Sequence, residues 1–514
     1  MKGSEGLLAT AAAAGVDTCF ANPGTTEIPL VEAFDQQSGV RAVLGLSEGV
    51  VTGAADGYGR MTSKPALTLL HLGPGFANGI ANLHNARRAR TPIINLIGEH
   101  ASWHQSADAP LNSDIESLAR PVSGWVGRTT SPSTAPGEFA EAYLAALRDR
   151  LPATLIAAAD HMWRQGAMPV EVPAAPARPQ VDEQRVAEIA KVLSSGRRPV
   201  LLLGGQALEN PEGIRTAVRI AAKAGGEVLA ERGSARVERG PMIPPVRTLP
   251  YFPEAMSATF EGFSDVILVG ARTPVSFFGY KGQPSHPLPD DVKVHELADA
   301  DSDALTALAA LAEATDSAAE KLPQAKRPQV TAPTGALDAD AIAVAIVLTQ
   351  PENAIVVNEG VSSSAAYPAI ADAAPAHCEL SQTGGAIGMG MPVATGAAIA
   401  CPDRAVINLQ ADGSAAYTVQ ALWTQAREEL NVTTVICSNS RYRILDEELR
   451  RAGIDDPGAA AASMTSLADP ALDWLQLAQG FGVEATRATT GEQLRTALSR
   501  ALTEPGPHLV EAVL

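Results

Sequence analysis

The chain has 514 residues, a formal net charge of −18, and 46% hydrophobic but only 4% aromatic residues. This length exceeds what one hydrophobic core usually organises and predicts about three domains. The acidic balance argues against nucleic-acid binding, which needs a basic surface. The sequence contains no run of about 18 apolar residues, so no membrane span is predicted.

The first ten residues, MKGSEGLLAT, lack the apolar core of a signal peptide. The four cysteines, Cys19, Cys378, Cys401 and Cys437, show no CxxC spacing. We therefore expect neither a zinc site nor a disulfide framework. We expect a reducing, cytoplasmic location.

Two proline-rich stretches, 168–180 and 321–335, predict linkers, because neither sequence suits a helix. We therefore expect three domains, at 1–168, 181–322 and 336–514. Each block alternates short Val/Ile/Leu runs with Ala-rich amphipathic runs, which is typical of βα units. The predicted fold class is α/β, with three doubly wound open parallel sheets.

The two outer blocks share a pattern of small-residue helix, strand, glycine turn, helix and strand. In chain order these are 52–60, 66–75, 76–89 and 91–98, and then 395–403, 405–414, 415–429 and 432–439. Either the two domains are related, or any two doubly wound domains look alike. In such sheets ligands bind beyond the carboxyl ends of the strands, so the chemistry is expected at the glycine turns.

The turn ADGS, residues 411–414, indicates a site for an anion and a hard cation. Gly413 allows close approach of a ligand, and Ser414 begins a helix whose free N–H groups favour phosphate. Asp412, the amide oxygen of Asn439 after the next strand and the carbonyl of Arg441 suit Mg²⁺, which prefers oxygen ligands. The alternative is an ordinary turn or helix cap.

Asp-Gly-Ser followed by Asn439 resembles the thiamin diphosphate motif, with Ala411 and Ser438 standing where the family has Gly and Asn. The resemblance runs along most of the chain, to the acetolactate synthase, benzoylformate decarboxylase and pyruvate oxidase superfamily. It implies a pyrimidine-binding first domain, a middle domain and a diphosphate-binding third domain, with thiamin diphosphate and Mg²⁺ as cofactors.

The resemblance also implies roles for residues that contact the cofactor rings. Glu48 matches the carboxylate that activates the aminopyrimidine; alternatively, it is an acidic residue that favours a helix start. Ile387 matches the apolar wedge between the two rings, or else packs in a core. Gly385, and less directly Met389, would offer backbone carbonyls to the pyrimidine.

On the same resemblance, Ser362 and Tyr442 would contact the diphosphate, although the serines at 362–364 also suit a helix cap. The segment 443–464 is expected to help cover the site. Thr25 matches a substrate-contacting serine. His71 matches a histidine that transfers protons; the alternative is a capping or buried histidine.

His100 and His104 lie close to where pyruvate decarboxylases carry paired histidines. Such a pair can also bind zinc, but a third ligand is missing nearby. In the middle domain, Phe277, Phe278 and Tyr280 would line an apolar pocket or belong to the core. The acidic residues of FAD-binding relatives are absent after "GAR" (270–272), so FAD is not expected.

The resemblance implies a decarboxylase or carboligase that acts on 2-oxo acids through a C2-enamine, similar to benzoylformate decarboxylase. Acetolactate synthase is the first alternative, since the turn 73–75, Gly-Pro-Gly, is typical of it. A catalytically silent cofactor-binding paralogue and a flavin-dependent oxidoreductase are further alternatives. The family shares each cofactor between subunits, so at least a homodimer, and by resemblance a homotetramer, is expected.

Overall fold

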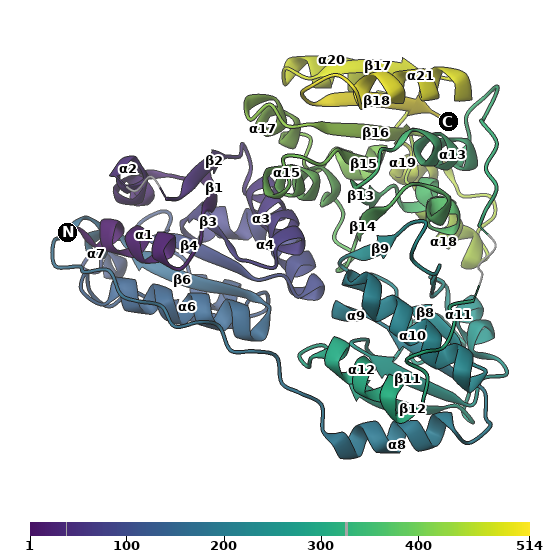
Figure 1. Cartoon of the computed structure of the whole chain (residues 1–514). Coiled ribbons are helices and arrows are strands. Elements are labelled where there is room, and N and C mark those ends of the chain that lie inside the picture. The colour runs from purple at the N-terminus through teal and green to yellow at the C-terminus, as the bar shows by residue number, and fades with distance from the viewer. Residues whose placement is uncertain (37–38, 324–326) are drawn as a thin grey trace. The chain divides into compact units, whose positions relative to one another are not determined.

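The computed structural model describes residues 1–36, 39–323 and 327–514. Within it the chain divides into two compact units (Figure 1). The first unit contains residues 1–176, 332–366 and 384–514, and holds the first and third sheets. The second unit contains residues 177–331 and 367–383, and holds the middle sheet.

The first sheet has six strands in the order β2-β1-β3-β4-β6-β5, and every strand pair is parallel. The strands are β1 (Thr18–Asn22), β2 (Arg41–Leu44), β3 (Ala66–His71), β4 (Ile93–Glu99), β5 (Trp125–Arg128) and β6 (Pro152–Ala158). The helices are α1 (Gly3–Ala13), α2 (Ile28–Gln36), α3 (Glu48–Thr62), α4 (Leu72–Ala89), α5 (Ile115–Ala119), α6 (Ala135–Asp149) and α7 (Ala159–Trp163), with the 3₁₀ turns η1 (Thr25–Glu27) and η2 (Gln105–Ala107).

The third sheet contributes five parallel strands to the same unit, in the order β13-β15-β16-β18-β17. They are β13 (Ala354–Glu359), β15 (Val406–Ala411), β16 (Val432–Ser438), β17 (Glu484–Ala488) and β18 (His508–Val513). The helices are α13 (Ala339–Thr349), α15 (Gly390–Ala400), α16 (Asp412–Ala415), α17 (Ala421–Arg427), α18 (Arg443–Arg451), α19 (Ala459–Thr465), α20 (Trp474–Gly480) and α21 (Gly491–Ala501), with the 3₁₀ turn η3 (Val361–Ser364).

The two sheets of the first unit share one topology. Numbered along the chain, β1-β3-β4-β6-β5 corresponds to β13-β15-β16-β18-β17, so the strands follow the same spatial order. This shared order supports the first of the two readings of the sequence, that the outer blocks are related domains.

The second unit contains a five-stranded parallel sheet in the order β10-β8-β7-β11-β12. The strands β9 and β14 pair antiparallel to each other. The elements are β7 (Pro199–Leu203), β8 (Glu227–Ala230), β9 (Val237–Arg239), β10 (Arg247–Thr248), β11 (Asp265–Val269), β12 (Lys293–Ala298), β14 (His377–Ser381), α8 (Glu183–Leu193), α9 (Gln206–Glu209), α10 (Pro211–Ala224), α11 (Pro253–Phe260), α12 (Ala304–Ala314), α14 (Tyr367–Ile370) and η4 (Ala371–Ala373). The predicted fold class, three parallel-sheet α/β domains, is confirmed.

Residues 168–180 of the first predicted linker form no helix or strand. Residues 324–326 of the second lie outside the described residues, and its other residues, 321–323 and 327–335, also form no helix or strand. The domain boundaries placed at these linkers stay a prediction. In the described part of the chain, no helix combines the length and apolar character that crossing a membrane requires.

Helix α3 is buried along nearly its whole length because it packs against α15 through small residues. Residues Gly49 to Arg60 are all buried. A methyl group added at Gly57 would overlap the carbonyl oxygen of Val393, and one added at Gly396 would overlap that of Ala54. The two helices therefore approach closely enough that only glycine fits at these contacts, and this contact joins the first and third blocks.

We expect Gly396→Ala to lower the free energy of unfolding of the first unit by at least about 1–3 kcal/mol, because the added methyl group overpacks a rigid backbone contact. Gly137→Ala in α6 is the control, since a methyl group there meets no atom within 4 Å. The control should be neutral or up to about 1 kcal/mol stabilising. Urea unfolding of both variants tests this; wild-type stability for Gly396→Ala would contradict the packing argument.

Candidate active site

The carboxylate of Asp412 joins the ends of two neighbouring strands of the third sheet. Asp412 directly follows β15 and is 2% exposed. Its Oδ1 accepts a hydrogen bond from the N–H of Gly413 at 2.7 Å, and its Oδ2 accepts from Asn439 at 3.0 Å and Ser440 at 2.6 Å. Burial raises the pKa of Asp412, while these N–H donors lower it. Asp412 and Asn439 therefore lie side by side.

Further oxygen atoms lie around Asn439. Its Oδ1 accepts from the N–H of Arg441 at 2.9 Å, and its Nδ2 lies 3.5 Å from Oγ of Ser363. The neighbouring serine, Ser363, thus makes this contact, whereas Ser362 is half-buried in η3. Helix α18 lies against η3 and contains no fully buried residue. The segment 443–464, predicted to help cover the site, therefore begins beside the strand ends that carry Asp412 and Asn439.

Gly413 and Ser414 are both buried within the third block. A methyl group at Gly413 would overlap the ring of Tyr442, so glycine lets that ring approach the turn. Ser414 Oγ accepts a hydrogen bond from Nε2 of Gln410 at 2.6 Å and donates to the carbonyl of Ala411 at 3.1 Å. The start of α16 is thus held by the strand that precedes it.

The loop 384–390 leads into α15 and needs glycine at two positions. Gly385 has φ +82° and Gly388 has φ +93°, conformations that side chains other than glycine rarely adopt. Ile387, between them, is half-buried. Met389 is fully buried, and its carbonyl accepts the first helical hydrogen bond, from Val393 at 2.9 Å.

Helix α4 of the first block holds the same loop through three side chains. The contacts are His84 Nε2 to the carbonyl of Gly384 (3.0 Å), Asn85 Nδ2 to that of Ala386 (2.8 Å) and Asn82 Nδ2 to that of Gly388 (3.4 Å). Asn82 Nδ2 also donates to the carbonyl of Gly49 at 2.8 Å. Asn82 therefore connects the loop with the start of α3, where Glu48 lies.

Glu48 is the first residue of α3 and is half-buried. Its Oε2 accepts a hydrogen bond from Nδ2 of Asn78 at 3.1 Å. A methyl group at Gly75 would lie 3.2 Å from Oε1 of Glu48, so the glycine leaves room beside this oxygen. A carboxylate with one oxygen held and the other beside open space can accept or donate a proton.

His71 ends β3 and has a buried carboxylate behind it. Its Nδ1 lies 2.8 Å from Oε2 of Glu27 and 3.2 Å from Oγ1 of Thr26. Glu27 is fully buried, and its Oε2 also accepts from the N–H of Gly24 at 2.7 Å. A carboxylate hydrogen-bonded to one ring nitrogen orients a histidine and favours the tautomer with the proton on that nitrogen, which leaves the other nitrogen, Nε2, for contact with a ligand.

Glu27 was not among the residues predicted from the sequence. It stands two residues after Thr25 in η1, and Thr25 itself is exposed at the same edge of the sheet. The available signal was the acidic residue that closes "NPGTTE" (22–27). A methyl group at Gly98 of β4 would overlap Oε1 of Glu27, so the neighbouring strand also makes room for this carboxylate.

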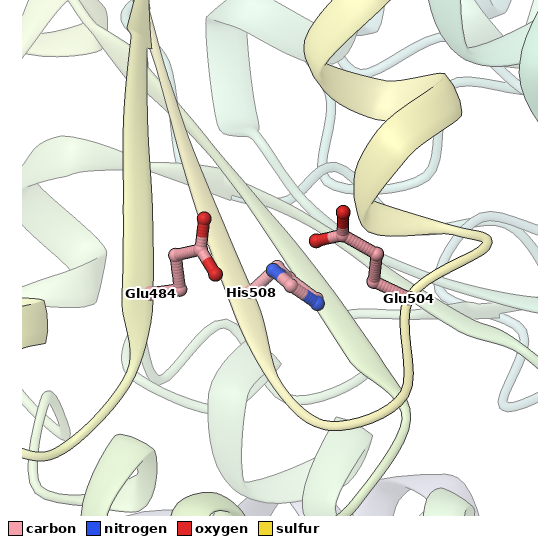
Figure 2. Close-up of side chains that lie close together, drawn as sticks. All are labelled: Glu484, Glu504 and His508. Carbon is pink, nitrogen blue, oxygen red and sulfur yellow. The ribbon is translucent and has the colours of Figure 1, made fainter.

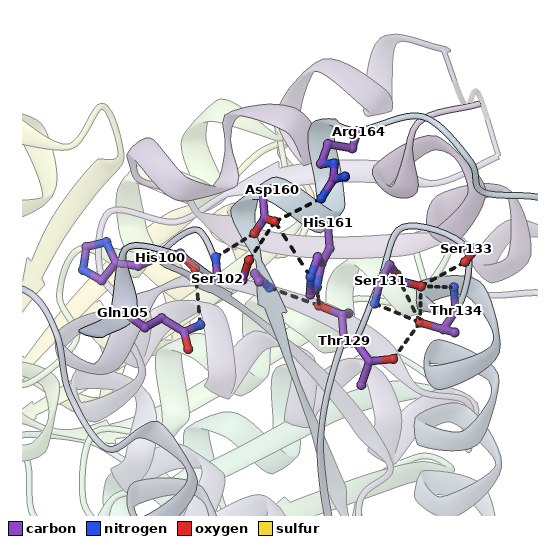
Figure 3. A network of polar contacts seen from close by, with 12 residues as sticks. His100, Ser102, Gln105, Thr129, Ser131, Ser133, Thr134, Asp160, His161 and Arg164 are labelled. Atoms are coloured by element: carbon purple, nitrogen blue, oxygen red, sulfur yellow. Dashed lines mark hydrogen bonds and ion pairs between the residues drawn. The ribbon is translucent and has the colours of Figure 1, made fainter. Parts of the chain in front are cut away.

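His100 and His104 follow β4, with ring centroids 5.4 Å apart. Figure 3 shows the network that fixes this loop: Ser102 donates to both oxygens of Asp160, from its N–H at 2.8 Å and its Oγ at 2.9 Å. Gln105 Nε2 lies 3.4 Å from the carbonyl of His100. These side chains do not form a three-ligand metal cluster within the described residues. Their roles stay open.

The one His/Asp/Glu cluster in the described residues with metal-ligand spacing is Glu484, Glu504 and His508. Figure 2 shows the imidazole of His508 between the two carboxylates. Glu484 and His508 begin β17 and β18, so the cluster lies at the amino ends of the strands, opposite Asp412. Arg500 forms ion pairs with both glutamates, so part of their negative charge is already balanced.

The aromatic residues Phe277, Phe278 and Tyr280 of the middle block are not core residues. Phe277 and Phe278 are 46% and 55% exposed, and Tyr280 also lies in this partly exposed loop. Their rings contact one another and those of Tyr251 and Phe252. A role in an apolar pocket, and the expected lack of FAD, stay predictions.

Comparison with known proteins matches this geometry to one family. Residues 1–118 match "Thiamine pyrophosphate enzyme, N-terminal TPP binding domain", and residues 360–512 match the corresponding C-terminal domain. A Mycobacterium tuberculosis protein named as a candidate acetolactate synthase large subunit, IlvX, is 47% identical over 100% of this chain and 99% of its own length.

Two further relatives are decarboxylases by name. Benzoylformate decarboxylase of Pseudomonas aeruginosa is 30% identical over 97% of this chain and 96% of its own length. The structure of Rhodococcus jostii RHA1 thiamine diphosphate-dependent 4-hydroxybenzoylformate decarboxylase superposes with a TM-score of 0.88, at 26% identity, over 100% of this chain and 99% of its own. The chain therefore belongs to the thiamin diphosphate-dependent enzymes, of the acetolactate synthase and benzoylformate decarboxylase type.

Proposed function

We propose that this enzyme is a thiamin diphosphate- and Mg²⁺-dependent decarboxylase that converts a 2-oxo acid to carbon dioxide and an aldehyde. The observation that carries the proposal is the contact between His71 Nδ1 and Oε2 of Glu27, at 2.8 Å. This contact would hold the imidazole in one orientation at the carboxyl end of β3, where open parallel sheets bind ligands. Full-length similarity to two named decarboxylases supports it.

The donors present fit the cofactor and the metal. Asp412 and Asn439 offer a carboxylate and an amide oxygen side by side, and with the carbonyl of Arg441 they form a set of hard oxygen ligands suited to Mg²⁺. Ser362, Gly413, Ser414 and Tyr442 would contact the diphosphate around that ion.

The rings of the cofactor would lie against the loop 384–390 and Glu48. Ile387 would separate the two rings, the carbonyl of Gly385 would accept from the pyrimidine amino group, and Met389 would remain a backbone contact. Glu48 would hold a proton at the pyrimidine ring. Bound thiamin diphosphate supplies the nucleophilic carbon and takes up the electron pair when carbon dioxide leaves.

His71 would supply the proton that the product carbon needs after carbon dioxide has left, and Thr25 would contact the substrate carboxylate or carbonyl. Glu27 would keep the imidazole oriented. We further propose a cytoplasmic homotetramer, in which each cofactor is shared between two subunits; the acidic charge and the cysteine spacing support the compartment.

Acetolactate synthase activity is the second candidate, because the relative with 47% identity carries that name. In that reaction a second 2-oxo acid, rather than a proton, is joined to the carbon that lost carbon dioxide. The two reactions share Glu48 and Asp412 and differ in the step that follows decarboxylation. A silent paralogue is the third, since Ala411 and Ser438 depart from the family motif.

Glu48→Gln should lower kcat by about 10²–10⁴-fold on whichever 2-oxo acid the wild type decarboxylates, because an amide cannot exchange the proton. Carbon dioxide release from a panel that includes pyruvate, benzoylformate and 4-hydroxybenzoylformate measures it. Glu141→Gln, an exposed glutamate in α6, is the control. No carbon dioxide from any member of the panel with the wild type would favour the silent paralogue.

Asp412→Asn should weaken binding of thiamin diphosphate at least about tenfold in the presence of Mg²⁺, and chelation of divalent ions should have the same effect on the wild type. Asp403→Asn, an exposed aspartate in the loop before β15, is the control. Isothermal titration calorimetry gives both affinities. Metal-independent binding by the wild type would remove Mg²⁺ from the proposal.

In a single turnover, His71→Ala should slow the release of aldehyde more than that of carbon dioxide, since only protonation of the product carbon needs the imidazole. Glu27→Gln should shift the products in the same direction, but less. The control is His295→Ala, because His295 also contacts a buried carboxylate, Asp265, at 2.8 Å, but in the second unit. An unchanged product ratio in His71→Ala would exclude the proposed proton donor.

A further inference from the structure

A fully buried carboxylate in the third block lies directly beneath the loop 384–390. Glu359 is the last residue of β13 and is 2% exposed. Its Oε1 accepts hydrogen bonds from the N–H groups of Gly388 at 2.8 Å and Met389 at 3.2 Å. Its Oε2 accepts from the N–H of Gly390 at 2.6 Å. Glu359 is not among the residues predicted to act in catalysis or to bind the cofactor or the metal.

The three N–H groups belong to Gly388 and Met389, which immediately precede α15, and to Gly390, its first residue. The N–H groups at a helix start have no intrahelical acceptors. Glu359 satisfies all three from a different strand, and its negative charge also suits the positive end of the helix. Burial raises the pKa of Glu359, while the donors around it lower it. The carboxylate therefore fixes the backbone that immediately follows Ile387.

A side-chain donor to Glu359, from Gln410, connects this loop with the turn 411–414. Gln410 Nε2 donates to Oε2 of Glu359 at 2.9 Å and to Oγ of Ser414 at 2.6 Å. Ser414 Oγ also lies 3.4 Å from the carbonyl oxygen of Glu359. The side chains of Glu359, Gln410 and Ser414 thus form one buried chain from the loop to α16.

The atoms around these three hydrogen-bonded side chains are closely packed. A methyl group added at Gly390 would overlap Oε1 of Gln410 and would lie 3.0 Å from Oε2 of Glu359. Oε1 of Gln410 has no hydrogen-bond partner among the described residues, so the amide stays in place although half of it is unsatisfied. Such an arrangement costs free energy and is retained only when the geometry it imposes matters.

We propose that Glu359 is a positioning residue that fixes the loop carrying Gly385 and Ile387 and, through Gln410, sets its distance from the diphosphate turn at Asp412–Ser414. One carboxylate then holds the segment that contacts the rings and the segment that contacts the diphosphate in a single geometry before the cofactor binds. This inference rests on the proposed roles of Gly385, Ile387 and Ser414.

The test uses Glu359→Gln in the full-length protein, because glutamine keeps the shape but replaces one acceptor oxygen with a donor. In the cofactor-free protein, the amides of residues 388–390 should exchange hydrogen for deuterium at least tenfold faster than in the wild type. With Mg²⁺ present, the Kd for thiamin diphosphate should rise at least tenfold. Glu359→Asp keeps the charge but is one methylene shorter, so it should restore part of the protection.

Glu511→Gln is the matched control. Glu511 is also a buried carboxylate of the third sheet, 4% exposed, but it contacts Arg487 at 2.6 Å on β17. It should leave both the exchange at 388–390 and the Kd within twofold of the wild type. Gln410→Met tests the connection separately: it keeps the three backbone N–H donors to Glu359, so exchange should stay within threefold while the Kd rises at least threefold.

Amide exchange in the cofactor-free protein does not depend on turnover, so this test can fail while the proposed decarboxylase activity stands, and the reverse. Wild-type exchange and affinity in Glu359→Gln would overturn the inference. If Glu359→Gln does not fold, Gln410→Met decides, and an unchanged Kd in that variant would overturn it.

Discussion

The carboxylate of Asp412 is the contact on which the candidate site depends. Its two oxygens accept N–H groups from its own turn and from the loop after β16, so it fixes the ends of two parallel strands at one edge. Parallel strands bring their carboxyl ends together, but they do not specify which backbone groups face a ligand. Asp412 determines which groups do so, because it orients Asn439 and the backbone that leads to Arg441.

The second condition is that the first and third blocks meet closely within one unit. Glycines allow α3 and α15 to pack against each other, and Asn82 connects the start of α3 with the loop 384–390. The start of α3 and the loop 384–390 are therefore coupled by hydrogen bonds within one chain.

The sequence predicted the features that local patterns encode. Alternating apolar runs predicted the three parallel sheets, and the spacing of Asp412 and Asn439 predicted neighbouring strand ends, because β15 and β16 are consecutive in the chain and adjacent in the sheet. It did not predict Glu27 or Glu359. Each contacts a partner more than 25 positions away in the sequence, and only folding brings the two close together. The same holds for His84 and Asn85, whose partners lie in another block.

The central claim is that one thiamin diphosphate is held by Asp412 at its diphosphate and by Glu48 at its pyrimidine. A crystal structure of the enzyme with thiamin diphosphate and Mg²⁺ tests this most directly. We expect the metal about 2.0–2.1 Å from oxygens of Asp412, Asn439 and Arg441, and a Glu48 carboxylate, from either subunit, hydrogen-bonded to the pyrimidine ring. A metal bound elsewhere, for example at Glu484, Glu504 and His508, or a pyrimidine ring without a Glu48 contact, would contradict the account.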